Sequence, residues 1–222
     1  MKTRLAKFLS AAVVGVGSIS SAMAAVTTVP NFSFEDPLIG AGDSGSGGQY
    51  LSTSSITDWT TGGVGSSGLT LATAVPVPLV GVTGNQALWL NGATTLTSSA
   101  SIHTIARGDQ YTLTVAAAGR ADFVSTGFQF QLIDGFSNSF ASSGTIDPLD
   151  DSIFRDYMIT YTVGMADPLI GQALRINLLG VTGSNQTSFD NVRLDVAAVP
   201  EPSTTAALLG GLALLGLRRR RA

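Results

Sequence analysis

The sequence predicts an all-β domain, a β-sandwich with jelly-roll topology, between residues 25 and 198. Several stretches alternate apolar and polar side chains, which is typical of strands that bury one face. Gly, Asn, Asp and Pro residues separate these stretches, as they do at antiparallel turns. No helical pattern interrupts them, which argues against a parallel α/β sheet. Eight or so short strands joined by turns favour a sandwich, with a jelly roll as the best topology.

Five stretches carry the alternation most clearly, with apolar residues at every second position: 111–115, 128–132, 157–163, 174–178 and 192–196. Three shorter stretches are further strand candidates: 31–34, 56–59 and 87–90. Residues 40–48 are rich in Gly and Ser and predict a loop.

Residues 1–24 have the order of a secretory signal peptide. Lys2, Arg4 and Lys7 precede an apolar run over residues 8–19, and small residues follow up to Ala22-Met23-Ala24. A charged region, an apolar region and an A-x-A site predict cleavage by signal peptidase after Ala24. The alternative of a retained anchor is less favoured, because the run is short for a membrane span of ~20 residues.

Residues 199–222 predict a second export signal. An almost wholly apolar segment covers residues 204–217, and it is followed by Arg218, Arg219, Arg220 and Arg221. The arginines are expected to stop transfer on the cytoplasmic side of a membrane. The segment is shorter than a usual span, but it has no polar face, which argues against an amphipathic surface helix. A hydrophobic membrane helix is therefore expected here, preceded by Val199, Pro200, Glu201 and Pro202.

This three-part ending resembles the PEP-CTERM sorting signal of Gram-negative bacteria that make exopolysaccharide. The resemblance implies a partner, the membrane-embedded exosortase, which recognises the Pro-Glu-Pro motif and releases or transfers the exported protein. It also implies transient anchoring in the inner membrane, followed by residence at the cell surface or in the extracellular matrix.

The domain between the signals resembles galactose-binding-like jelly rolls, which include many carbohydrate-binding modules. The opening motif is matched by residues 31–37 (NFSFEDP) and 56–59 (ITDW), although Asp58 stands where the family usually has Gly. The closing motif is matched by residues 188–194 (SFDNVRL). The resemblance implies that Glu35 and Asp190 bind a structural Ca²⁺ that joins the two ends of the domain. The alternative is that both carboxylates only cap turns.

Carbohydrate binding is a further expectation for this domain. Tyr50 and Trp89 could stack on sugar rings, with Arg120 or Gln86 donating hydrogen bonds beside them. Trp59, the other tryptophan, is expected in the core.

Composition excludes several classes of function. Residues 25–200 hold five arginines against fourteen acidic residues, a net charge of −9, which argues against a nucleic-acid partner. No cysteine occurs, and His103 is the single histidine, so thiolate and multi-histidine metal sites are excluded. No G-x-S-x-G motif is present either. Asp147, Asp150 and Asp151 predict a solvated acidic turn rather than a calcium loop.

The sequence therefore favours a non-enzymatic exported protein, which binds polysaccharide or serves as a structural component. One alternative is a secreted polysaccharide hydrolase with an unrecognised carboxylate pair, because such pairs have no fixed sequence spacing. Another is a matrix scaffold without affinity for glycans.

Overall fold

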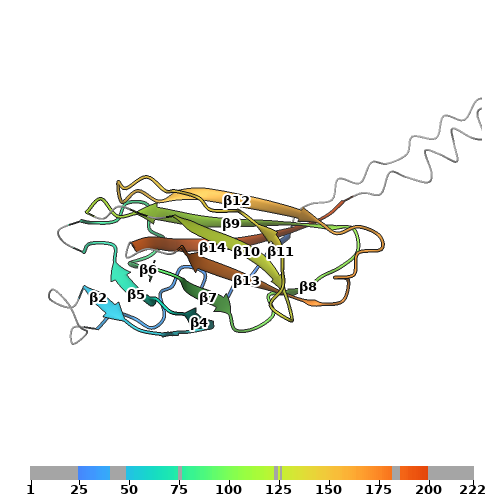
Figure 1. The fold of residues 1–222 in the computed structure, drawn as a ribbon, viewed down its shortest axis with the longest axis horizontal. Coiled ribbons are helices and arrows are strands. Elements are labelled where there is room, and N and C mark those ends of the chain that lie inside the picture. Colours follow the sequence, from blue (N-terminus) through green and yellow to red (C-terminus); the bar gives the residue numbers. More distant parts are fainter. Residues whose placement is uncertain are drawn as a thin grey trace, which may run out of the picture.

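The computed structural model describes residues 25–40, 49–74, 77–122, 125, 127–181 and 186–199, and they form two stacked antiparallel sheets (Figure 1). This confirms the predicted all-β sandwich. No helix occurs among the described residues. The described part of the chain therefore contains no candidate membrane-spanning helix. Outside the described residues lie the predicted signal peptide (residues 1–24), residues 200–202, the apolar segment 204–217 and the arginine cluster.

Sheet A holds seven strands, and six of them follow one another across it: β12 (Arg155–Thr162), β9 (Asp109–Gly119), β14 (Gln186–Ala198), β6 (Gln86–Asn91), β5 (Ser66–Leu71) and β2 (Tyr50–Ser52). The seventh, β1 (Ala25–Thr27), pairs with the end of β14.

Sheet B also holds seven strands, with six in this order: β11 (Ser139–Ser142), β10 (Phe128–Asp134), β13 (Ala173–Gly180), β7 (Thr94–Ser98), β4 (Trp59–Gly63) and β3 (Ser55–Ile56). The short strand β8 (His103–Thr104) pairs with β13.

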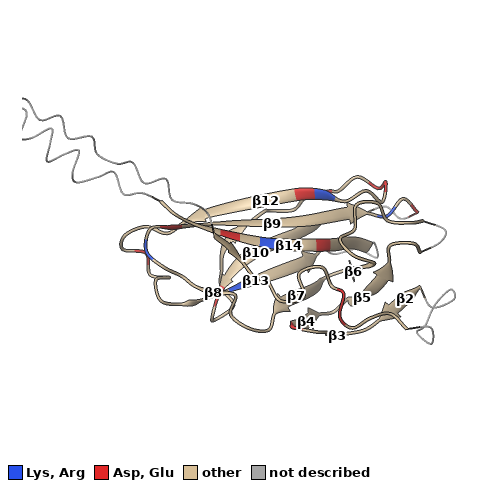
Figure 2. Cartoon of the chain, turned by 180° about the vertical axis from the view of Figure 1, so that it is seen from behind, with Lys and Arg blue, Asp and Glu red and all other residues tan. Residues whose placement is uncertain are grey.

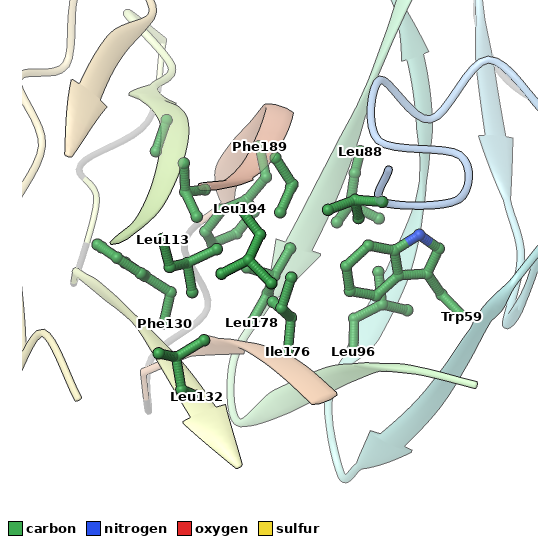
Figure 3. Close-up of a cluster of buried hydrophobic side chains, with 14 of the residues drawn as sticks. Trp59, Leu88, Leu96, Leu113, Phe130, Leu132, Ile176, Leu178, Phe189 and Leu194 are labelled. Atoms are coloured by element: carbon green, nitrogen blue, oxygen red, sulfur yellow. The ribbon is translucent and has the colours of Figure 1, made fainter. Parts of the chain in front are cut away.

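The core lies between the two sheets, where the alternating apolar residues meet (Figure 3). Leu113 of β9, Phe130 of β10 and Ile176 of β13 are fully buried there, as the alternation predicted. Trp59 also belongs to this core, which agrees with the expectation for that residue. Charged residues are sparse over both sheets (Figure 2), so apolar burial is the main force that holds the sheets together.

The five long predicted strands are confirmed as parts of β9, β10, β12, β13 and β14, and residues 87–90 lie in β6. The prediction of a strand at 31–34 is wrong, because these residues form a turn in which Asn31 and Phe34 have positive φ angles of 46° and 55°. The stretch 56–59 is divided between β3 and β4 by a tight turn. Most of the loop predicted at 40–48 lies outside the described residues.

Candidate functional site

The turn at residues 31–37 is closed by the side chain of Asn31. Its Nδ2 donates to the carbonyls of Asp36 at 2.6 Å and Thr57 at 2.9 Å, and its Oδ1 accepts from the Asp36 amide. Phe34 is fully buried, with its ring centroid 5.4 Å from that of Trp59. The two halves of the opening motif, far apart in sequence, are thus joined by one amide and one aromatic contact.

Asp58, which replaces the usual glycine of this motif, has a φ of 65°. This is the left-handed region that glycine adopts without strain and that Asp tolerates better than most residues. The turn therefore places a non-glycine residue in a conformation that favours glycine, which implies some backbone strain.

Glu35 and Asp190 meet at the loop that leads into β6. Glu35 Oε1 accepts from the amides of Asn85 at 2.8 Å and Gln86 at 3.0 Å. Asp190, on β14, accepts from the Thr83 amide and, at 2.7 Å, from the Asn191 amide. The structure therefore brings the two predicted ligands to the same loop, from opposite ends of the domain.

Two local features of the backbone determine how Glu35 and Asp190 are placed at this loop. Gly84 has a φ of 90°, and any side chain there would collide with the Glu35 carboxylate. The β14–β9 register shifts between Asp190 and Arg193, so β14 bulges, and the Val192 amide donates to the Phe32 carbonyl at 2.9 Å. The bulge thus attaches the N-terminal turn to the last strand.

Asp190 is an unusual carboxyl group, because its side chain is fully buried. Its pKa is raised from 3.8 to about 7, chiefly by burial and in smaller part by the negative charge of Glu35, against the lowering effects of the Thr83 and Asn191 amides and of the charge of Arg193. Arg193 itself pairs with Asp156 at 2.6 Å. A buried carboxylate beside a second carboxylate is an environment that a bound cation would stabilise.

The fit to Ca²⁺ is partial. Ca²⁺ takes six to eight oxygen ligands, and Glu35 and Asp190 supply two carboxylates. Among the described residues, no group of three or more His, Cys, Asp or Glu side chains is placed to hold a metal. Backbone carbonyls and water would have to complete the coordination. These two carboxylates suit a hard cation in chemistry, whereas the four amides already bonded to them also suit the alternative role as turn caps.

The three residues predicted to bind carbohydrate lie on the same face of sheet A, the face turned away from the core. Tyr50 pairs with Thr70, and Trp89 pairs with both Gly68 and Ser188. Paired residues point to one side of a sheet, and so do residues two apart on a strand. Arg120 follows the end of β9 and continues this face, since Ala118 pairs with Ser188.

Tyr50 and Arg120 are in contact although β5, β6 and β14 lie between their strands. The guanidinium carbon of Arg120 is 5.6 Å from the centroid of the Tyr50 ring. Arg120 is fixed by two bonds to Asp122, at 2.9 and 2.6 Å, and by one to Gln186 Oε1 at 2.9 Å. This contact therefore bridges the outer face of sheet A.

Trp89 lies on the same face but is only 8% exposed. Its indole NH donates to the Leu69 carbonyl at 3.1 Å, and its ring packs so closely on Gly68 that no side chain would fit there. The structure thus leaves little of this ring for a sugar to stack on. Gln86 is also buried, where its side-chain amide binds the carbonyls of Phe34 and Pro37 and the amide of Ile39.

Three buried polar atoms on this face have no hydrogen-bond partner among the described residues: Asn91 Oδ1 of β6, and Gln186 Nε2 and Ser188 Oγ of β14. Ser188 and Gln186 stand two and four residues before Asp190. Buried polar atoms are almost always paired, so such a row indicates a place where water or a ligand binds. Sequence reasoning missed all three residues. We refer to Tyr50, Trp89, Arg120, Gln186 and Ser188 as the outer-face site.

The acidic segment has a structural role. Asp150 accepts from the Ser125 amide at 2.9 Å, and Asp151 forms an ion pair with Arg155 at 2.7 Å. Hydrogen bonds from Arg155 lower the pKa of Asp151.

Comparisons with known proteins identify two regions of the chain. The model of the HpiC1-like cyclase family (HpiC1 cyclase) matches residues 25–195, and the model of the PEP-CTERM protein-sorting motif matches residues 198–221. The predicted sorting signal is thereby confirmed, and it supports export and exosortase-mediated sorting to the cell surface. No curated protein sequence matches the chain.

Solved structures share the fold at low identity. The Stig cyclase Fisc from Fischerella sp. TAU, in complex with (3Z)-3-(1-methyl-2-pyrrolidinylidene)-3H-indole, has a TM-score of 0.68 and 18% identity, over 80% of this chain and 100% of its own. A cyclase from Fischerella sp. TAU, in complex with 4-(1H-indol-3-yl)butan-2-one, has a TM-score of 0.68 and 17% identity, over 79% of this chain and 99% of its own. The CBM22-1 xylan-binding domain of Paenibacillus barcinonensis Xyn10C is more distant, with a TM-score of 0.44 and 12% identity over 68% of this chain and 93% of its own.

Proposed function

The chain belongs to the HpiC1-like cyclase family, and we propose that it is an exported, exosortase-processed surface protein whose sandwich serves as a non-catalytic binding module. In this proposal an exosortase cuts at Val199 to Pro202 while residues 204–217 are held in the inner membrane. The released domain then resides at the cell surface or in the extracellular matrix, where its ligand is a polysaccharide.

The observation that supports binding is the Tyr50–Arg120 contact across the outer face of sheet A. Tyr50 is partly exposed, and its ring is held by a guanidinium that Asp122 and Gln186 fix in place. A partly exposed and fixed aromatic ring suits stacking on a sugar ring, and Arg120, which is buried and bonded to Asp122 and Gln186, supports the ring from within the face. Because Trp89 is only 8% exposed, Tyr50 is the accessible ring, and the site suits one or two sugar residues better than a long chain.

Calorimetry with purified residues 25–199 and bacterial exopolysaccharide tests this proposal. We expect saturable binding, which Tyr50→Ala should weaken at least tenfold because it removes the accessible ring. Val64→Ala is the matched control, since Val64 is 92% exposed in the turn between β4 and β5 and is expected to have no effect. Absence of binding, or an equal loss in both variants, would refute glycan recognition at this site.

The processing route has its own test. Intact mass spectrometry of the protein from culture medium and from membrane fractions should give an N-terminus at Ala25 and a C-terminus within or near the Pro-Glu-Pro motif. A mature chain that keeps residues 204–222 would contradict exosortase processing.

We further propose that Glu35 and Asp190 bind Ca²⁺ and thereby hold the N-terminal turn to β14. The proposal is supported by the burial of Asp190 beside a second carboxylate. Chelation at neutral pH should lower the melting temperature of the natural protein and should leave that of Asp190→Asn unchanged. Identical melting curves with and without chelator would refute the calcium site.

An enzyme is the second candidate function, and one observation favours it. A buried carboxyl group with a pKa of about 7 can donate a proton at neutral pH, and Asp190 lies on the same strand and face as the unpaired atoms of Ser188 and Gln186. Two relatives of this fold were solved with indole compounds. Binding of 4-(1H-indol-3-yl)butan-2-one that Ser188→Ala weakens would support a cyclase-like site. Release of reducing ends from polysaccharide would instead support a hydrolase.

A further inference from the structure

The folded domain extends to the first residue of the sorting motif. The β14–β9 pairing continues to Ala198, which is opposite Asp109, and the Val199 amide donates to the Gly108 carbonyl at 2.7 Å. The first described strand, β1, begins at the same place, because its first residue Ala25 pairs with Val196. Both ends of the domain thus lie at one end of the sandwich, which we call the terminal end (Figure 1).

The chain between the terminal end and the apolar segment is short. Five residue steps separate Val199 from Thr204. A fully extended chain covers at most ~3.6 Å per residue, so these steps reach at most ~18 Å. The polar layer on one side of a bilayer already takes up roughly 5–8 Å of that distance. While residues 204–217 are in the membrane, the terminal end must therefore lie at the bilayer surface.

Met165 is an exposed apolar side chain at the terminal end. It is 50% exposed, in the loop after β12. That loop is bonded to the last described residues, because the Gly108 amide donates to the Val163 carbonyl at 3.2 Å and Gly108 also binds Val199. Met165 thus lies two residues from this row of hydrogen bonds.

Phe136 is a second such side chain, 80% exposed at the tip of the β10–β11 turn. Asp134 makes this turn rigid by accepting from the amides of Phe136 at 2.9 Å and Asn138 at 2.8 Å. Asp134 pairs with Leu174, and Leu174 pairs with His103 of β8. His103 Nε2 lies 3.9 Å from the carboxylate of Asp109, the residue opposite Ala198, so this turn also belongs to the terminal end. A rigid turn that presents an exposed Phe is suited to insert into the interface of a bilayer.

We propose that the terminal end, with Met165 and Phe136, is a docking surface for the outer leaflet of the inner membrane, used until the exosortase releases the domain. The inference rests on the transient anchoring proposed above. It adds a defined orientation: β14 stands with its C-terminal end toward the lipid, and the turn between β4 and β5 points away from it.

The absence of cysteine from the sequence makes this orientation directly measurable. Single cysteines at Met165 and Phe136 are labelled with an environment-sensitive fluorophore in the full-length protein. The protein is reconstituted into vesicles of phosphatidylethanolamine and phosphatidylglycerol that carry a doxyl-labelled lipid. Val64→Cys is the control, because the Val64 amide bonds to Ala93 near Asn91, which pairs with Gln186 at the opposite end of β14.

We expect the labels at residues 165 and 136 to be quenched several-fold more than the label at residue 64. If the full-length protein does not float with the vesicles, the anchoring itself is wrong. If it floats but all three labels are quenched equally, the docking surface is wrong while the anchoring stands. Melting curves of the labelled variants verify that each one is folded.

Discussion

Asp190 should govern how the stability of the domain depends on pH between about pH 5 and pH 8. Its pKa is about 7 in the folded protein, against an ordinary value of 3.8. A carboxyl group whose pKa is raised by folding binds its proton more tightly in the folded state than in the unfolded state. Its favourable contribution is therefore complete below pH 3.8 and is lost as the pH rises through 7.

The size of this effect follows from the difference between the two pKa values. A shift of about three pKa units corresponds to about 4 kcal/mol over the whole titration. Integrated from about pH 5 to pH 8, the free energy of unfolding of the metal-free protein should fall by about 2–3 kcal/mol. For a domain of this size, the melting temperature should fall by roughly 4–12 °C. Asp134, Asp151 and Asp167 do not contribute, because their pKa values are lowered.

Urea unfolding of residues 25–199 at a series of pH values measures this effect. The measurement is made in the presence of a chelator. Asp190→Asn should flatten the profile. Asp156→Asn is the matched control, because it removes a half-exposed carboxylate that pairs with Arg193 and should leave the slope unchanged. A profile that still falls by 2–3 kcal/mol in Asp190→Asn would show that another group is responsible.

Three further predictions concern single residues. Asp58→Gly should raise the free energy of unfolding by about 0.5–1 kcal/mol in urea titrations, because it relieves a positive φ; no gain would mean that the turn is unstrained. Gly84→Ala should lower the free energy of unfolding by about 1–3 kcal/mol, because the new methyl group would collide with Glu35. Adding Glu35→Ala should recover part of this loss. Additive losses in the double variant would contradict the collision. Asp167→Asn should lower the pKa of Tyr161 from about 12 in an ultraviolet titration, because the hydrogen bond to Asp167 is the largest cause of the shift; an unchanged pKa would refute this.

The long strands could be predicted because each one buries a full row of apolar side chains on one face. The residues of β9, β10 and β13 that face the core alternate without interruption, and the sequence shows that period directly. Strands such as β5 and β7 could not be recognised in this way. Their sequences, SSGLTL and TTLTS, hold few apolar residues, and burial of Ser and Thr leaves no period to detect.

The residues of the candidate site were likewise predictable only where the sequence carries a recognisable pattern. Glu35 and Asp190 were found because a motif at each end of the chain singled them out, and the structure brings them to one loop. Ser188 and Gln186 were not found, because nothing local marks a polar residue of a strand as buried and unpaired. The surroundings of Gln186 include Arg120, which follows the end of β9, lies 66 residues away in the sequence and donates to Gln186 Oε1.

The bulge in β14 explains why one short segment serves both the core and the site. In a regular strand, Phe189 and Val192 would point to opposite faces, because they are three residues apart. Both are buried in the core, since the bulge after Asp190 takes up one extra residue, with Asn191 at a φ of 47°. The same bulge frees the Val192 amide to bind Phe32 and leaves Asp190 on the outer face beside the Thr83 amide. Loss of the bulge should therefore have two effects at once: it should detach the N-terminal turn, and it should separate Glu35 from Asp190. The closing motif is in this sense a single structural unit rather than a set of separate residues.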